Sequence, residues 1–351
     1  MMTDSSYIEK IKKIHKERAD LIHYTPLENS TTFSEMSGNE VYLKLENLQK
    51  TGSIKIRGAL NKISRLGKEQ VTQGVITASA GNHGQAVALA ARLADIPATI
   101  VVPEDTPIVK IEAMKNYGGT VIEHGMSYDD AHQKAMEINE REGQTYVPAF
   151  NDEDIIQGQA TLGLEILEQL PETDYIFCPI GGGGLISGVS SYCKTLNPDV
   201  KIIGVQSEKA PSVHESFKNE EMTIADLSET ICDGIAVKHP GDLTLRLIMK
   251  HVDDVVLVSD EEVANSILLL LERAKTYAEG AGAASLAAVL NKKINISGKN
   301  VVAIISGGNL TPNLLDRIIH KGLIKEGRLL KIKTIMKDVP GSLMKVLEII
   351  A

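Results

Sequence analysis

The chain has 351 residues, and its 46 Asp and Glu residues exceed its 37 Lys and Arg residues, which gives a formal net charge of −9 at pH 7. This length is sufficient for one large or two ordinary domains with a substantial hydrophobic core. The acidic balance, without a basic run to offset it, argues against a dedicated nucleic-acid binder and leaves a small molecule as the expected partner.

The cysteine and hydropathy patterns restrict the compartment and the metal chemistry. Cys178, Cys193 and Cys232 form no C-x-x-C pair, so we expect reduced thiols and find no spacing typical of an iron–sulfur or zinc site. The first residues lack the basic and apolar regions of a signal peptide, and no apolar run approaches the roughly 20 residues that span a bilayer. We therefore expect a cytoplasmic protein with no membrane partner, and a bound metal stays an open question.

In chain order, an amphipathic helix is expected over residues 8–22, and Pro26 then favours an extended segment. From there, short apolar runs alternate with helix-length amphipathic stretches. The expected strands are residues 41–45, 75–78, 98–102, 120–123, 175–179, 201–205, 255–258 and 301–306. Strands separated by helices predict βαβ units, and the consecutive apolar residues predict parallel sheets that helices cover on both faces.

Two later stretches depart from this alternation. Residues 207–240 are charged and rich in turn formers, and we interpret them as irregular structure around a site. Residues 329–336 predict a further strand, followed by a turn over 338–342 and an amphipathic helix whose pattern is unfinished at the last residue. Because such a half-unit cannot bury its own apolar face, we expect either a truncated chain or docking on the main body or on a partner.

The segment Gly52-Ser53-Ile54-Lys55-Ile56 places one lysine between apolar residues at the expected start of a helix. The helix dipole and the loss of water at this position both lower the pKa of an amine. A neutral amine is a nucleophile suited to forming a Schiff base with an aldehyde. The alternative is an ordinary surface lysine, which the flanking isoleucines and the permissive backbone of Gly52 disfavour.

The segment Ser79-Ala80-Gly81-Asn82 follows an expected strand and precedes an alanine-rich helix. Backbone amides at such a helix start bind anions, here a substrate carboxylate, and the Asn82 side chain has the groups to hydrogen-bond a ring hydroxyl. The alternative is a strand-to-helix turn that Asn82 merely caps. We interpret His83 as structural.

Four consecutive glycines, Gly181, Gly182, Gly183 and Gly184, follow another expected strand and precede Leu185. Without Cβ atoms, the N–H groups of this loop and of Leu185 can converge on a phosphate at a helix N-terminus. Dinucleotide binding is the rival interpretation, but the G-x-G-x-x-G fingerprint is absent here and the chain has no G-x-x-x-x-G-K-[ST] loop.

The segment Ser306-Gly307-Gly308-Asn309 follows the last expected strand of the main body. A hydroxyl at Ser306, unlike a carboxylate, would leave a pyridine nitrogen unprotonated and limit the negative charge that the ring absorbs. This favours loss of a β leaving group over chemistry such as transamination. Glu279 lies in a glycine-rich segment and is a weaker candidate for a polar site residue. An aldehyde, a phosphate and a pyridine nitrogen together indicate pyridoxal phosphate.

These segments, in this order and spacing, resemble the pyridoxal-phosphate enzymes of the tryptophan-synthase-β type (fold type II), and most closely the threonine dehydratase family. The segments that carry the resemblance are residues 53–58, 79–83, 157–161, 181–184, 233–237 and 306–309. It implies an α/β fold with two open parallel-sheet domains and the cofactor in the cleft between them. The large domain would comprise residues 1–45 and 150–325, and the small domain residues 46–149.

By this resemblance, Lys55 attaches pyridoxal 5′-phosphate and later moves the α-proton of the substrate. The implied cofactor contacts are Lys55, Asn82, Gly181, Gly182, Gly183, Gly184, Leu185 and Ser306, and the implied substrate contacts are Ser79, Ala80, Gly81 and Asn82. The implied reaction is β-elimination of L-threonine to 2-oxobutyrate and ammonia, with L-serine giving pyruvate by the same route. A homodimer or homotetramer is the family-level expectation.

Small differences separate the relatives. Threonine synthases typically carry Asp where Ile56 stands, and eukaryotic-type serine racemases place a serine acid/base where Ala80 stands. Because Ala80 cannot move a proton, dehydration is favoured over racemisation. The chain also departs from the family at Ile54, usually Phe, and at Cys232, commonly Ala, without an expected loss of activity.

Three alternatives remain beside the dehydratase. A serine racemase or another fold-type-II lyase is the nearest enzyme, and a ligand-binding protein on a decayed enzyme scaffold is the rival from another class. A nicotinamide-dependent oxidoreductase is disfavoured by the missing glycine fingerprint.

The last residues, 329–351, resemble the first strand, turn and helix of an ACT regulatory domain, notably Asp338-Val339-Pro340-Gly341-Ser342. Only part of an ACT unit fits in this length. ACT domains commonly bind amino acids, so the resemblance implies a regulatory segment that is incomplete in this chain.

Overall fold

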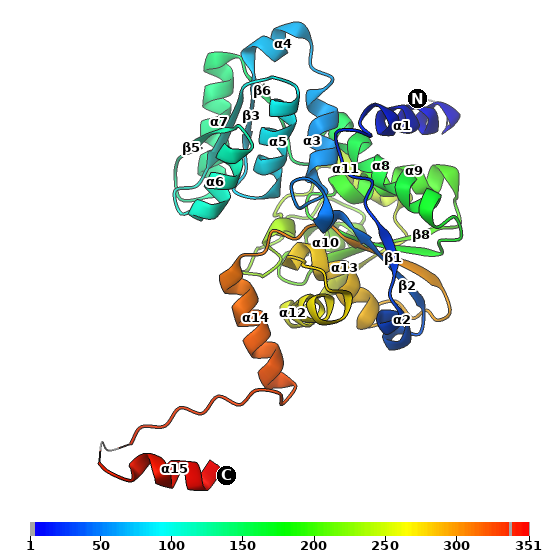
Figure 1. The fold of residues 1–351 in the computed structure, drawn as a ribbon. Helices are drawn as coiled ribbons and strands as arrows, with labels where there is room; N and C mark the ends of the chain where they lie inside the picture. The colour runs from blue at the N-terminus through cyan, green and yellow to red at the C-terminus, as the bar shows by residue number, and fades with distance from the viewer. Residues whose placement is uncertain (1–3, 337–338, 351) are drawn as a thin grey trace. The chain divides into compact units, whose positions relative to one another are not determined.

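Figure 1 shows a computed structural model of the chain, which describes residues 4–336 and 339–350. The chain divides into two compact units, Met1–Thr311 and Pro312–Ala351. The strands of the described residues all lie in the first unit, and the second unit contains helices α14 (Pro312–Lys325) and α15 (Ser342–Ile350).

Six strands form the larger sheet of the first unit, in the order β1-β2-β10-β7-β8-β9. Their bounds are β1 (Leu27–Asn29), β2 (Glu40–Leu45), β7 (Tyr175–Pro179), β8 (Lys201–Ser207), β9 (Asp254–Val258) and β10 (Asn300–Ile305). Neighbouring strands are parallel except for β1 and β2, which are antiparallel. The last strand in sequence, β10, lies between β2 and β7, with Val301 opposite Val41 on one side and Tyr175 on the other.

Four parallel strands form the smaller sheet, in the order β5-β4-β3-β6. Their bounds are β3 (Val75–Ala78), β4 (Ala98–Val102), β5 (Thr120–Glu123) and β6 (Thr145–Tyr146). All residues of the central strand β3 are buried, as expected for a strand that is covered on both faces.

Helices surround both sheets (Figure 1). The α-helices of the first unit are α1 (Asp4–Glu17), α2 (Thr31–Ser37), α3 (Lys55–Ile63), α4 (Lys68–Gln73), α5 (Asn82–Leu93), α6 (Ile108–Asn116), α7 (Tyr128–Glu142), α8 (Glu153–Gln169), α9 (Gly184–Leu196), α10 (Ser212–Asn219), α11 (Asp242–His251), α12 (Asp260–Leu269) and α13 (Gly280–Leu290). Shorter helical turns are η1 (Glu46–Leu48), η2 (Asp233–Ile235) and η3 (Leu270–Ala274). Helix α3 packs against α5 and against α8, so the helix that begins at Lys55 bridges the surroundings of the two sheets.

Each sheet has its own apolar core. Around the larger sheet, Ile176, Ile202 and Val302 are fully buried in one cluster. Around the smaller sheet, Val75 and Ile100 pack with the alanines of α5 in another. With no tryptophan and few aromatic residues, both cores consist mainly of aliphatic side chains, whose burial stabilises the fold by about 25 cal/mol per Å² of apolar surface.

The expected fold class is confirmed, because the strands form parallel sheets with helices between them. Strands expected at residues 75–78, 98–102, 120–123 and 175–179 are observed with those bounds. The other expected strands of the main body differ from the observed ones by one or two residues at an end.

Other expectations were wrong. The first helix ends at Glu17 rather than at residue 22, and β6 was not predicted. The stretch 207–240 is irregular over most of its length, as expected, but it contains α10 and η2. Residues 329–336 form no strand, because a strand needs a partner edge and this segment pairs with none in the described chain. Asp338 of the expected turn lies outside the described residues, whereas the helix that follows the turn is observed as α15.

Candidate active site

Lys55 is the first residue of α3, as the sequence predicted. Its Nζ lies 3.4 Å from the carbonyl oxygen of Ala149, a long contact that leaves the amine weakly held. Burial lowers the pKa of Lys55 to about 8, and the Glu279 carboxylate opposes that shift. The amine is therefore much closer to its neutral, nucleophilic form at neutral pH than an exposed lysine is.

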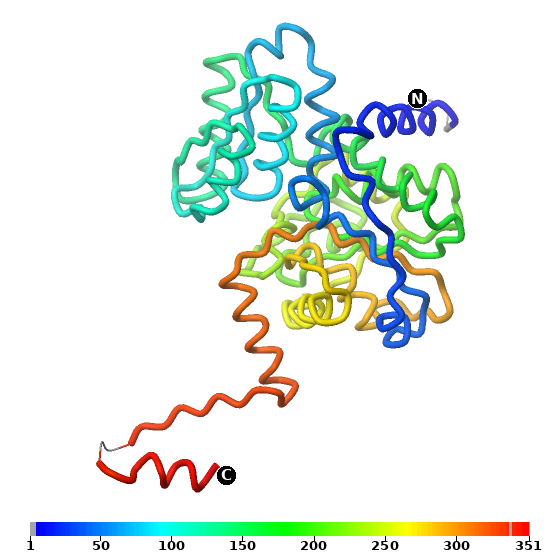
Figure 2. Tube along the Cα trace, viewed as in Figure 1, coloured from blue at the N-terminus to red at the C-terminus, as the bar shows by residue number. Residues whose placement is uncertain are grey.

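The segment before Lys55 is joined to the segment after β10. The Ile54 amide donates to the Ser306 carbonyl at 2.9 Å, and the Gly308 amide donates to the Gly52 carbonyl at 2.9 Å. These two segments lie side by side in Figure 2, although more than half of the sequence separates them. Ser306 is buried, and its hydroxyl donates to the Ala281 carbonyl at 3.4 Å. The structure thus brings the predicted lysine and the predicted serine to one place.

The glycine loop connects β7 to α9, which begins at Gly184. Gly183 has φ +93°, a left-handed conformation that favours glycine. A Cβ at Gly182 would lie 2.3 Å from Cδ1 of Phe150, so no side chain fits there. Within the described residues, the amides of 181–186 have no hydrogen-bond acceptor, whereas the Ser187 amide donates to the Gly183 carbonyl at 3.0 Å. Unpaired amides at a helix N-terminus suit a phosphate.

The loop 79–82 connects β3 to α5, and the Gly81 amide donates to the Ser79 hydroxyl at 3.2 Å. Asn82 is the first residue of α5 and does not cap it, because the cap position is Gly81. Instead, Asn82 Nδ2 donates to Glu279 Oε1 at 2.6 Å. Ala80 is partly exposed in the turn and carries no group that could move a proton.

His83, which the sequence suggested to be structural, is buried against backbone. Its Nε2 lies 2.9 Å from the Val147 carbonyl oxygen, and burial lowers the pKa of the ring to about 4, with the Lys55 charge acting in the same direction. A neutral, buried imidazole that is hydrogen-bonded to backbone supports the packing of α5.

Two side chains at the site were underweighted or missed. Glu279, considered a weak candidate, is buried and accepts the hydrogen bond of Asn82. Asn309 was quoted within a motif without a role, and its Nδ2 donates both to Asn82 Oδ1 at 2.7 Å and to the Thr51 carbonyl at 2.9 Å. The signal in the sequence was the motif Ser306-Gly307-Gly308-Asn309 itself, but its partners lie more than 200 residues away.

The groups that the structure assembles fit pyridoxal phosphate. A lysine amine of lowered pKa can bind an aldehyde, unpaired amides can hold a phosphate, and the Asn82 amide and the Ser306 hydroxyl can meet the polar groups of a pyridine ring. Phe150 links the glycine loop to Lys55, since it contacts Gly182 and follows Ala149 in sequence.

Comparisons with known proteins agree with this fit. Residues 19–307 match the family model described as "Pyridoxal-phosphate dependent enzyme". The chain belongs to this family. Its cofactor is pyridoxal 5′-phosphate, and its fold is the fold type II architecture of parallel α/β sheets.

Individual members of the family are similar over most of the chain. The L-threonine ammonia-lyase of Thermotoga maritima is 51% identical over 98% of this chain and 86% of its own length. The catabolic L-threonine dehydratase TdcB of Escherichia coli K12 is 41% identical over 89% of this chain and 95% of its own. Among solved structures, processed threonine deaminase isoform 2 of Solanum lycopersicum superimposes with a TM-score of 0.86 at 36% identity, covering 90% of this chain and 92% of its own. Maize serine racemase superimposes with a TM-score of 0.84 at 37% identity, covering 91% and 98%.

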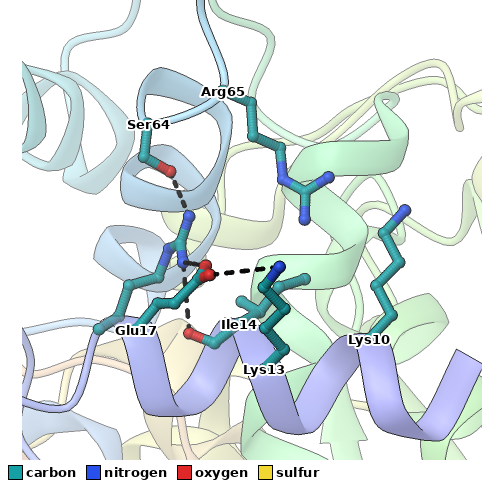
Figure 3. Close-up of a pocket in the computed structure, with 7 residues that line it drawn as sticks. Lys10, Lys13, Ile14, Glu17, Ser64 and Arg65 are labelled. Atoms are coloured by element: carbon teal, nitrogen blue, oxygen red, sulfur yellow. Dashed lines mark hydrogen bonds and ion pairs between the residues drawn. The ribbon is translucent and has the colours of Figure 1, made fainter.

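A separate hollow of about 360 Å³ lies between α1 and the end of α3 (Figure 3). Its lining residues are Lys10, Lys13, Ile14, Glu17, Arg18, Ser64 and Arg65. Arg18 reaches across it, donating to the Ile14 carbonyl and to the Ser64 hydroxyl. No residue of the predicted site lines this hollow, so we do not assign it to the candidate active site.

The described residues give two further findings. In residues 4–336 and 339–350, no group of three or more His, Cys, Asp or Glu side chains is arranged to hold a metal ion. None of the helices in this part of the chain has the length and apolar character needed to cross a bilayer.

Proposed function

We propose that this chain catalyses the β-elimination of L-threonine to 2-oxobutyrate and ammonia, and of L-serine to pyruvate and ammonia. The observation that carries the proposal is Lys55, a buried amine of lowered pKa at the start of α3, held beside Ser306 by the Ile54–Ser306 hydrogen bond. The names of relatives at 41–51% identity support the choice of substrate.

Pyridoxal phosphate, when bound, supplies an electron-withdrawing ring that makes the α-proton of an attached amino acid acidic. Lys55 would hold the cofactor covalently, and its Nζ, once free, would accept the α-proton of the substrate. Its lowered pKa leaves Nζ able to accept that proton near neutral pH.

The remaining residues hold the reacting groups in place. The amides of Gly181, Gly182, Gly183, Gly184 and Leu185 would bind the phosphate, because they have no hydrogen-bond acceptor within the described residues. The Ser306 hydroxyl would meet the ring nitrogen of a bound cofactor, and the Asn82 amide would meet its ring hydroxyl. The loop of Ser79, Ala80, Gly81 and Asn82 receives the substrate carboxylate at the start of α5.

The larger organisation is part of this proposal. We assign residues 1–45 and 150–325 to a large domain and 46–149 to a small domain, because the smaller sheet is built entirely from residues 75–146. Helix α14, the last part of this large domain, is also the first helix of the second compact unit. We also propose a cytoplasmic homodimer or homotetramer, which light scattering of the purified protein tests, and an ACT-like regulatory segment over residues 329–351.

The test is an absorption spectrum of the purified protein before and after addition of L-threonine, with assay of 2-oxo acid. A cofactor band that shifts on addition, with accumulating 2-oxobutyrate, is the expected result. Lys55→Ala is expected to lose turnover and the band of the covalently attached cofactor. Substantial turnover in Lys55→Ala, or a wild-type protein without a cofactor band, would refute the assignment.

Serine racemase is the second candidate, favoured by the superposition on the maize enzyme. Ala80 argues against it, because the side chain on that turn has no proton to give. Appearance of D-serine from L-serine at a rate comparable to pyruvate formation would reverse the preference.

A further inference from the structure

Glu279 is a buried carboxylate at the site that the reaction described above does not use. It occupies the position just before α13, and its amide donates to the Gly307 carbonyl at 3.1 Å. A Cβ at Gly307 would lie 2.3 Å from Glu279 Oε1, so glycine at that position makes the room that the carboxylate needs.

A continuous chain of side-chain hydrogen bonds starts at this carboxylate. Glu279 Oε1 accepts from Asn82 Nδ2 at 2.6 Å, and Asn82 Oδ1 accepts from Asn309 Nδ2 at 2.7 Å. Asn309 Nδ2 also donates at 2.9 Å to the carbonyl of Thr51, four residues before Lys55. The two bonds to Asn82 fix which end of its amide is the donor and which is the acceptor.

This chain of bonds joins the two sheets. Asn82 begins the helix that follows β3 of the smaller sheet. Asn309 follows β10 of the larger sheet, and Glu279 directly precedes α13, which packs on β10. Asn82 is therefore held by residues that adjoin the larger sheet. The orientation of its side chain depends on Glu279 and Asn309 rather than on its own helix.

Charged groups from several elements face Glu279. Burial raises the pKa of Glu279 to about 7, and Asp233 of η2 acts in the same direction, while the Asn82 hydrogen bond, Lys110 of α6 and Lys55 lower it. The Cys232 thiol also lies within its electrostatic reach. In return, the Glu279 carboxylate raises the pKa of Lys55 against the effect of burial. Glu279 thus acts on the lysine by charge and on Asn82 by hydrogen bonding.

We propose that Glu279 and Asn309 are positioning residues, which together fix the Asn82 side chain across the site, and that Glu279 also supplies the negative charge that faces the Lys55 nitrogen. The proposal rests on the proposed function only in that both place the cofactor at Lys55. The hydrogen bond to Asn82 and the charge that faces Lys55 can be tested separately. An amide at position 279 keeps the oxygen that accepts from Asn82 and removes only the charge.

The test compares the holoenzymes of wild type, Glu279→Gln and Asn309→Leu in the absence of substrate. The pH midpoint of the cofactor absorption spectrum reports the Lys55 nitrogen, and dialysis reports cofactor retention. Glu279→Gln is expected to lower the midpoint by about one pH unit, because a facing negative charge is lost, and to retain cofactor as wild type does. Asn309→Leu is expected to keep the wild-type midpoint and to lose cofactor about tenfold more readily.

Glu262→Gln is the matched control, because it makes the same substitution away from the site. Glu262 completes the capping box of α12 with Ser259 and pairs with Lys293, which lies beyond the far end of α13. It is expected to match wild type in both measurements. A wild-type midpoint in Glu279→Gln would overturn the charge effect, and wild-type cofactor retention in Asn309→Leu would overturn the positioning effect.

If Glu279→Gln binds no cofactor, Glu279→Asp tests the two effects by removing the hydrogen bond instead of the charge. It keeps the charge and withdraws the oxygen from Asn82, so the midpoint should stay and retention should fall. The opposite pattern would overturn the proposal. A wild-type protein that carries the cofactor but produces no 2-oxo acid refutes the proposed function alone, because these measurements use no substrate.

Discussion

We predict that Arg57→Met destabilises the first unit by about 3–5 kcal/mol, the usual cost of removing one partner from a buried ionic group. Arg57 lies two residues after Lys55 and is fully buried. Its guanidinium donates to Glu46 at 2.9 and 2.7 Å and to Glu165 at 2.6 and 2.9 Å. Lys44 donates to Glu165 at 2.7 Å, so two cations balance two anions away from water.

Without the arginine, two carboxylates would share a single cation in the same buried space. Burial disfavours the charged form of Glu46, but Arg57, together with Lys44 and Thr25, more than offsets this and keeps the pKa of Glu46 below its ordinary value. In wild type, Glu46 therefore contributes stability above its unfolded pKa and loses it as the pH falls through the lower folded pKa. In Arg57→Met burial acts unopposed by Arg57, Glu46 takes up a proton at higher pH, and the deficit should shrink towards acid pH.

The assay is thermal unfolding followed by circular dichroism at neutral and acid pH. For a unit of about 311 residues the expected loss corresponds to a drop in Tm of about 5–8 °C at neutral pH. The control is Arg141→Ala, which removes an exposed pair with Glu142 and should change stability by less than about 0.5 kcal/mol. An Arg57→Met variant as stable as Arg141→Ala would refute the reasoning.

Two further predictions concern cofactor binding. Gly182→Ala should weaken pyridoxal phosphate binding at least about tenfold in a fluorescence titration, because the added Cβ would overlap Phe150. The control is Gly67→Ala, whose Cβ would meet Gln70 at an ordinary 3.6 Å and which should bind as wild type does. An unchanged affinity in Gly182→Ala would contradict the tight loop. The rate at which the apoprotein takes up pyridoxal phosphate should rise with pH and level off above about pH 8. The neutral amine of Lys55 is the nucleophile, and burial lowers its pKa to about 8. A rate that still rises steeply above pH 9 to 10, as for an exposed lysine, would contradict this prediction.

Much of the fold was predictable because the signal for buried parallel strands is local. Runs such as residues 75–78 and 98–102 are apolar at consecutive positions, and the helices between them carry their own periodicity. The position of Lys55 at a helix start and of the glycines before α9 was predictable for the same reason, since glycine and apolar neighbours act on the adjacent backbone.

The rest depends on contacts that no local pattern reveals. Lys44 and Glu46 lie in a strand and in the turn after it, where charged residues ordinarily face water. They are buried because α3 and α8 place oppositely charged side chains, Arg57 and Glu165, against them. The Asn82–Glu279 bond spans 197 positions. Conversely, residues 329–336 have the composition of a strand but no partner edge in the described chain, so propensity alone misled.

The central place of β10 constrains when this protein can mature on the ribosome. Among the described strands β10 is the last in sequence, yet it lies between β2 and β7 in the sheet. A nascent chain that has emerged only as far as α13 lacks the strand that unites the two halves of the sheet, and it lacks Ser306 and Asn309 as well. Cofactor capture is therefore expected only after residue 309 has left the ribosome, and the earlier strands must stay protected from wrong pairing until then.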